Sequence, residues 1–299
     1  MQTLVEKIFG PGFFLWKPVY MSLAFGLTCP LVGVYLVVRR LVFMGVALPQ
    51  VSSCGIAFAF ALQAWGLLPH AHESAGEQTL AFIGSTVFTL AAILVLSLLA
   101  RRGRGSVEAR VGTVYVLAGA WSIILLSKNP LAEHGLLDLL KGEIISVSDF
   151  QLGVTAGTFA LVVAMLWLFK KEFLLVSFDR EMAVSLKKNV LLWDSFLFFL
   201  IGLTISMAVL GVGSLVTFGF LLLPPLTAHL FARNMRQFTL LASGLGGVIA
   251  LVGFVLAYRL DLPVGPTDVA LLGVLYAIAF CARKLLLRSR APQTAAAQP

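Results

Sequence analysis

The chain has 299 residues, of which 59% are hydrophobic and only 12% charged, and its mean hydropathy is +0.96. A soluble domain carries about 25% charged residues, so this composition excludes an ordinary water-soluble fold and favours a protein that is dissolved in lipid. The net charge of +8 could indicate nucleic-acid binding, but the basic residues cluster at the ends of apolar segments, which argues against that partner.

Apolar segments of about 20 residues recur along the chain, which is the length that an α-helix needs to cross a bilayer. Residues 1–17 precede these segments and are predicted to lie at the membrane interface. The predicted spans are 18–38, 42–66, 79–100, 111–127, 150–169, 191–209, 214–232, 238–258 and 267–287. The predicted fold is therefore an all-α, polytopic bundle of eight to nine transmembrane helices within one domain, 18–288, followed by a disordered tail, 289–299.

Most of the 22 lysines and arginines fall in every second connection between these spans. The basic connections lie near 39–40, 101–110, 170–188, 233–236 and 283–290. Cytoplasmic loops of membrane proteins carry such an excess, so these connections and the C-terminus are predicted to be cytoplasmic. Nine helices would place the N-terminus outside, and a re-entrant segment in place of one helix would bring it inside.

Small residues and helix breakers mark two further features of the bundle. The pairs Ser22/Gly26 and Gly153/Gly157 have the four-residue spacing that allows helices to approach closely. The segments 211–213 (Gly-Val-Gly) and 224–225 (Pro-Pro) are expected to break the helix near 214–232. Irregular backbone at membrane depth is tolerated only when it is buried or lines a cavity, so this region is a candidate part of a pathway.

The cytoplasmic connection at about 170–190 reads KKEFLLVSFDREMAVSLKKN over 170–189. It mixes apolar residues with charges of both signs. Such a mixture is typical of an amphipathic helix that lies on another protein, and it is equally compatible with a solvated, positively charged loop. The composition alone does not choose between the two.

Enzyme signatures are missing from the sequence. No lysine follows a glycine, so there is no GxxxxGK[ST] loop for nucleotide hydrolysis, and HExxH, GxSxG and GxGxxG are also absent. We therefore expect a transporter subunit with no catalytic residues. An ion-coupled secondary transporter is the rival class, but none of the 14 acidic residues lies clearly in the middle of a predicted span.

Five segments together, in order and covering nearly the whole chain, resemble the integral-membrane permease subunit of the zinc/manganese/iron-chelate ABC importer family. They are LVGVYLVVRRLVFMGVALPQVSSCGIAFAF (31–60), GEIISVSD (142–149), LVSFDREMA (175–183), FLLLPPLTAHLFAR (220–233) and YRLDLPVGPTDVALLG (258–273).

The resemblance implies the fold of vitamin B12 and siderophore importer permeases, in the bacterial plasma (inner) membrane. It implies a permease homodimer in the lipid membrane, with the pathway at the dimer interface. A cytosolic ABC ATPase would use the ATP, an extracytoplasmic substrate-binding protein would deliver the substrate, and this chain would bind no cofactor. The implied ATPase-coupling loop comprises Ser177, Phe178, Asp179, Arg180, Glu181, Met182 and Ala183.

The pathway motif departs from the family pattern Gly-Asp-Ala-Leu-Ser-His-Ala, whose Asp and His are thought to meet the metal. Here Val46 stands at the carboxylate position and Gln50 at the imidazole position, and Cys54 replaces the usual proline. Valine cannot ligate a cation, and an amide oxygen is a poor substitute for imidazole towards zinc. The metal ligands are therefore unknown.

Three interpretations of this loss remain open. The protein passes zinc, manganese or iron along a pathway with few fixed charges; it moves a metal chelate or a small organic solute; or it uses other side chains, such as Cys29. The candidate pathway residues are Met44, Val46, Gln50, Ser53, Cys54 and His229. Buried Met and Cys are usually packing residues, and His229 lies close enough to the cytoplasmic end for a structural, interfacial role.

Overall fold

The fold is that of a computed structural model, which describes residues 16–65, 74–101, 106–127 and 149–290. Nearly all of these residues are helical. The predicted interfacial segment 1–17 and the predicted tail 289–299 therefore lie almost wholly outside the described residues. In chain order the helices are α2 (Trp16–Val38), α3 (Val42–Ala64), α4 (Ser74–Arg101), α5 (Val107–Ser127), α7 (Asp149–Leu168), α8 (Lys170–Phe178), α9 (Arg180–Ser185), α10 (Val190–Phe231), α11 (Met235–Leu260) and α12 (Val264–Arg290).

Eight of the described helices are long and apolar enough to cross a membrane, and the described residues contain no strand. The prediction of an all-α bundle with eight to nine spans is confirmed. Each predicted span has a counterpart, and the segments predicted as 191–209 and 214–232 are the two arms of one helix, α10. Its 42 residues are broken at Gly213, where φ is 78° and ψ is 169°, a backbone conformation that favours glycine.

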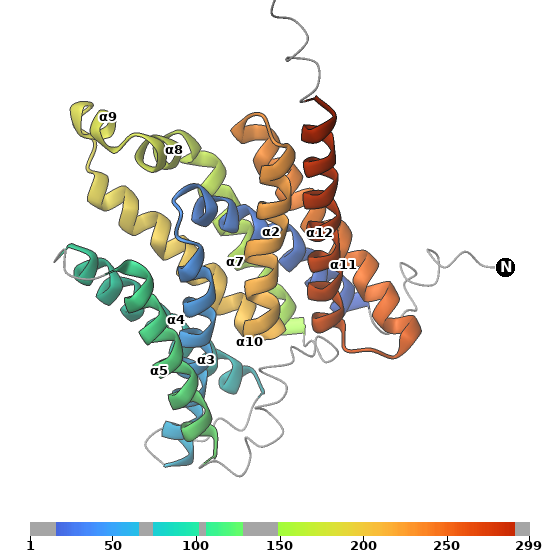
Figure 1. Cartoon of the computed structure of the whole chain (residues 1–299). Coiled ribbons are helices and arrows are strands. Elements are labelled where there is room, and N and C mark those ends of the chain that lie inside the picture. The colour runs from blue at the N-terminus through green and yellow to red at the C-terminus, as the bar shows by residue number, and fades with distance from the viewer. Residues whose placement is uncertain (1–15, 66–73, 102–105, 128–148, 291–299) are drawn as a thin grey trace, which may run out of the picture.

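The two arms of α10 fold back on each other. Asp194 in the first arm bonds Arg39, just after α2, and Ala228 in the second arm packs on Val34 of α2. In a straight helix Asp194 and Ala228 would be about 51 Å apart, whereas Val34 and Arg39 are close neighbours along the chain. Figure 1 shows the resulting bend, with both ends of α10 at the end of the molecule that carries α8 and α9.

Pro224 and Pro225 lie inside α10 and do not end the helix, although they interrupt its hydrogen-bond ladder as predicted. Proline at 225 removes the hydrogen bond that the carbonyl of Leu221 would accept within the helix. That carbonyl instead packs on the backbone of Gly33 in α2, so tightly that a Cβ on Gly33 would overlap the Leu221 oxygen. The close approach of α2 supports the second arm at the position where the helical ladder is interrupted.

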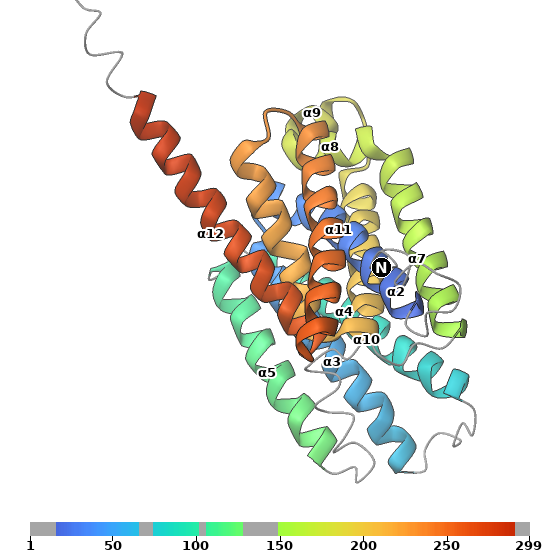
Figure 2. The same ribbon diagram turned by 90° about the vertical axis from the view of Figure 1, so that its right-hand side faces the viewer.

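The helices form two flanks around a buried centre. α3, α4 and α5 lie on one flank, α11 and α12 on the other, and α2, α7 and α10 between them (Figures 1 and 2). The fully buried large side chains include Phe25 of α2, Leu48 of α3, and Ile205 and Phe220 of α10. The centre of the bundle is therefore built largely on the two arms of α10.

Glycines set the closest helix contacts. Gly26 of α2 packs on Gly246 of α11, and Ser22 donates a hydrogen bond to the Ala250 carbonyl at 3.4 Å, which confirms the predicted close approach at Ser22/Gly26. Gly153 and Gly157 of α7 have no described atom within 4 Å of where a Cβ would stand. The same prediction for that pair is wrong, because the glycines face outwards.

Candidate functional site

Val46 and Gln50 lie one helical turn apart on α3, and both are partly exposed. The Gln50 amide reaches α5, where its Nε2 atom would be 3.3 Å from a Cβ added to Gly119. A larger residue at position 119 would crowd this amide. The α3–α5 seam therefore presents one neutral amide and one apolar side chain at the positions where the family resemblance implies metal ligands.

Ser53 and Cys54 continue the seam one turn further along α3. Cys54 is 6% exposed and packs in a small apolar cluster with Leu125 of α5. The Oγ atoms of Ser53 and of Ser122 on α5 are both buried, and neither has a hydrogen-bond partner among the described residues. This part of α3 and α5 therefore contains packed apolar side chains and two buried hydroxyls that can hydrogen-bond a polar solute.

The remaining pathway candidates lie elsewhere. Met44 and Cys29 are buried in the main hydrophobic core, which is the packing role. His229 is exposed in the last turn of α10, with its ring 5.4 Å from the ring of Phe238 in α11. Within the part of the chain that the structure describes, no group of three or more His, Cys, Asp or Glu side chains could hold a metal ion.

The predicted coupling segment forms two short helices, α8 and α9. Asp179 caps α9 by accepting a hydrogen bond from the Met182 backbone N–H at 2.8 Å, and Ala183 is fully buried against Val176 and Val190. Arg180 begins α9, but its side chain lies outside the described part, and Glu181 is exposed in the first turn. The segment is therefore a packed structure rather than a solvated loop.

Two apolar side chains of this segment point away from the bundle. Phe178 is 66% exposed and Met182 is 52% exposed, in a stretch that carries charges of both signs. Contiguous exposed apolar patches with a polar rim mark protein- or membrane-interaction sites. We call Phe178 and Met182, with the exposed Glu181, the α8–α9 surface.

Ser177 turns inwards instead. Its Oγ accepts a hydrogen bond from Arg39 Nε at 2.9 Å, and Arg39 Nη1 pairs with Asp194 Oδ1 at 2.6 Å. The side chains of Arg39 and Asp194 are only 10% and 14% exposed. This connection between the turn after α2, α8 and α10 was not foreseen from the sequence.

A cluster of hydroxyls joins α3, α4 and α10 inside the bundle. Ser52 and Ser85 share a hydrogen bond of 2.6 Å, and Ser206 donates to Thr89 at 3.4 Å. All four side chains are buried. Hydroxyl bonds of this kind hold membrane helices together, and because serine and threonine are common in such helices the sequence gives no signal for their convergence.

Asp268 lies near the start of α12, which agrees with the prediction that no acidic residue lies clearly in the middle of a span, but its burial was not predicted. It is fully buried in α12, packed so closely on α11 that a Cβ on Gly253 would overlap Oδ1, and neither carboxyl oxygen has a hydrogen-bond partner among the described residues. The sequence placed Asp268 at the very start of a span, where a carboxylate could reach water. The helix in fact begins at Val264, one turn earlier.

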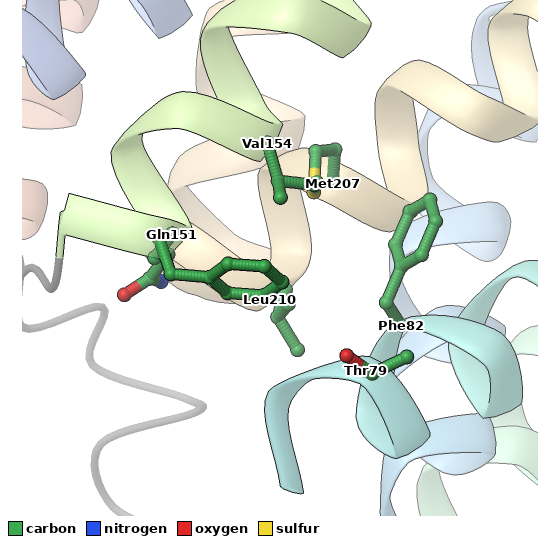
Figure 3. Close-up of a pocket in the computed structure, with 7 residues that line it drawn as sticks. Thr79, Phe82, Gln151, Val154, Met207 and Leu210 are labelled. Carbon is green, nitrogen blue, oxygen red and sulfur yellow. The ribbon is translucent and has the colours of Figure 1, made fainter. Parts of the chain in front are cut away.

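A separate cavity of about 150 Å³ opens between α4, α7 and α10 (Figure 3). Phe82, Val154, Met207 and Leu210 line it, and Thr79 and Gln151 stand at its edge. None of the predicted site residues contributes to it. Its lining is almost entirely apolar, so it offers no ligands for an ion.

Relatives of this chain share its length and fold. The manganese transport system membrane protein MntC of Listeria innocua is 27% identical over 267 residues, with 89% of this chain and 90% of the relative covered. MntD of Bacillus subtilis, also a manganese transport system membrane protein, is 29% identical over 270 residues, with 85% and 87% covered. The solved structure of PsaBC from Streptococcus pneumoniae in complex with Fab has the same fold, with a TM-score of 0.77 at 24% identity and 89% and 91% coverage. The sequence pattern of the ABC 3 transport family matches residues 13–283, and the chain therefore belongs to that family.

Proposed function

We propose that the chain is the membrane-spanning permease subunit of an ATP-driven importer for a divalent transition metal ion. Two copies would form the pathway between them, in a bacterial inner membrane with the C-terminus in the cytoplasm. The observation that carries this proposal is the α8–α9 surface in a chain of the ABC 3 transport family. The names of the relatives MntC and MntD favour manganese as the ion.

The ATPase would dock on the α8–α9 surface. Phe178 and Met182 would bury their exposed apolar area in the partner, which is the anchoring that a few interface residues usually supply. The capped, packed helix α9 would present these anchors in one orientation, so that little conformational entropy is lost on docking. A substrate-binding protein would deliver the cargo at the opposite end of the bundle.

A second cargo is favoured by one observation at the α3–α5 seam. Gln50 presents a neutral amide next to Gly119, and Val46 is an apolar residue. This combination suits a solute that needs no ligands from the protein, such as a metal chelate, better than a bare cation. The same permease architecture would then carry the metal with its coordination sphere already filled.

Reconstitution tests both cargoes. The chain is incorporated in liposomes with its ATPase and binding protein, and uptake of manganese, zinc, ferrous iron and a chelated metal is compared with and without ATP. The control complex carries an ATPase whose P-loop lysine is replaced. We expect ATP-dependent uptake of one of the free ions, with manganese the first candidate, and none with the control ATPase.

Uptake by the chain alone, or with the control ATPase, would overturn the permease assignment and favour an ion-coupled secondary transporter. ATP-dependent uptake of only the chelated metal would replace the divalent ion by a chelate as the cargo. Competition with an excess of each unlabelled ion distinguishes these cases from leakage.

A further inference from the structure

We propose that Arg39 is a positioning residue that transmits movement of the α8–α9 surface to α3, through its bonds to Ser177 and Asp194. This inference rests on the proposed function, because it says how the ATPase would reach the pathway. Arg39 lies in the turn between α2 and α3, and it is the residue at which three elements meet: α3, α8 and the first arm of α10.

The orientation of Arg39 is not that of an ordinary basic residue at the cytoplasmic end of a helix. Arg40, its neighbour, is exposed, as expected of an arginine that only sets the orientation of the protein in the membrane. The side chain of Arg39 is 10% exposed and lies 5.6 Å from the ring of Phe198. A buried ion pair is weak evidence for a purely stabilising role, and the inward position places Arg39 in contact with both α8 and α10.

The input side is α8. The first half of this helix is fixed, since Phe173 is fully buried and packs edge-on against Tyr35 of α2 at 6.2 Å and Trp193 of α10 at 5.9 Å. Its last residue, Phe178, is exposed on the α8–α9 surface. Ser177 stands directly before Phe178 and donates to the Phe173 carbonyl at 2.5 Å. A partner that displaces Phe178 therefore displaces the oxygen that Arg39 Nε donates to.

The output side is α3. The turn from Arg39 is short: Arg40 has a φ of 57°, the Leu41 N–H donates to the Leu36 carbonyl at 2.8 Å, and α3 begins at Val42. Because these hydrogen bonds hold the turn together, a displacement of the Arg39 backbone is passed on to the start of α3. Gln50 lies only about 12 Å further along the helix axis, so a shift or tilt at the start of α3 reaches the seam with α5.

Within the described part of the chain, one hydrogen-bond donor of Arg39 remains without a partner. Arg39 Nη2 is buried and has no hydrogen-bond partner among the described residues. A buried donor that is left unsatisfied is costly, so Nη2 is a spare donor with which the guanidinium can follow Ser177 when α8 moves, while it keeps Asp194.

The experiment compares substitutions that separate the bridge from the ion pair. Ser177→Ala removes the bond to Arg39 and leaves the ion pair, and Arg39→Lys keeps a charge opposite Asp194 but loses the planar fork that serves two acceptors. Ser185→Ala is the matched control, because Ser185 also donates to a carbonyl four residues earlier, at 3.0 Å, but is exposed on α9 and does not contact Arg39.

The complete complex in liposomes is assayed for ATP hydrolysed per metal ion taken up, with the melting temperature of each variant measured in parallel. We expect Ser177→Ala and Arg39→Lys to raise this ratio roughly tenfold, the factor that corresponds to one lost hydrogen bond to a charged group, while the melting temperature stays within a few degrees. Ser185→Ala should leave the ratio unchanged.

Wild-type ratios for both Ser177→Ala and Arg39→Lys would overturn the inference, and so would an equal rise for Ser185→Ala. A fall in melting temperature that accounts for the lost uptake would assign Arg39 a purely structural role. Failure of the inference leaves the unsubstituted complex with ATP-dependent uptake, whereas failure of the proposed function removes that uptake and overturns both.

Discussion

Substituting alanine at Gly246 tests the close packing of α2 against α11. The added Cβ would overlap the Gly26 carbonyl oxygen and stand 2.6 Å from Pro30 Cγ. The atoms in the way belong to backbone and to a rigid ring, so one of the helices must move. Overpacking of this kind costs about 1–3 kcal/mol, and a backbone clash belongs at the upper end of that range.

Alanine also favours the helix over glycine by about 1 kcal/mol, so the net loss for Gly246→Ala is about 2 kcal/mol. Gly244→Ala is the matched control, since it lies two residues away in α11 and a Cβ there meets nothing within 4 Å. Gly244→Ala should gain the higher helix propensity of alanine and lose no stability to overpacking.

Thermal unfolding of the protein in detergent, followed by intrinsic fluorescence, measures both variants. At about 2–4 °C for each kcal/mol, Gly246→Ala should lower the melting temperature by roughly 4–8 °C, and Gly244→Ala should raise it slightly. A melting temperature for Gly246→Ala at or above that of the unsubstituted protein would refute the reasoning, because it would mean that α2 and α11 do not touch at this glycine.

Three further outcomes are expected. Phe178→Ala and Met182→Ala should each weaken binding of the ATPase in a pull-down, by roughly 30-fold in affinity if each is an interface anchor. Trp167→Ala is the control, because it truncates a side chain that is 80% exposed on α7, and it should leave binding unchanged. Equal losses for all three variants would contradict the docking of the ATPase on the α8–α9 surface. Asp268→Ala should raise the melting temperature, because a buried carboxyl with no partner costs about 1–3 kcal/mol, and a fall would reveal a partner for it. Val46→Asp combined with Gln50→His should increase zinc binding in equilibrium dialysis, since carboxylate and imidazole are zinc ligands. Unchanged binding would show that a cation does not reach this turn of α3.

The span pattern could be predicted from the sequence because lipid imposes one length and one secondary structure on a crossing segment. The bounds of α2, α3, α5 and α7 lie within four residues of the predicted ones at each end. Hydropathy also separated the two arms of α10, because glycines mark the break. It could not show that proline at 224 and 225 is tolerated, since that depends on the backbone of Gly33, which is far away in the sequence.

The residues proposed for the site could be named from the sequence, but their geometry could not. The resemblance to a known family proposes a coupling role for 177–183, and only the folded chain shows that Ser177 faces Arg39 while Phe178 faces outwards. Asp268 was missed because its burial depends on where α12 begins and on the absence of a side chain at Gly253. Neither property is visible in a single sequence, in which any residue near the end of an apolar run can be placed in water.

The break at Gly213 also has a consequence for how the chain enters the membrane during synthesis. The arms of α10 are joined without a charged linker, since Asp194 and His229 are the ionisable residues of 190–231 and both lie far from the bend. No charged residue at the bend therefore fixes it on one side of the membrane during insertion. The two arms must partition as a pair, oriented only by Lys187 and Lys188 before them and by Arg233 and Arg236 after them. Removing those four charges would leave the two arms of α10 without an adjacent signal for their orientation.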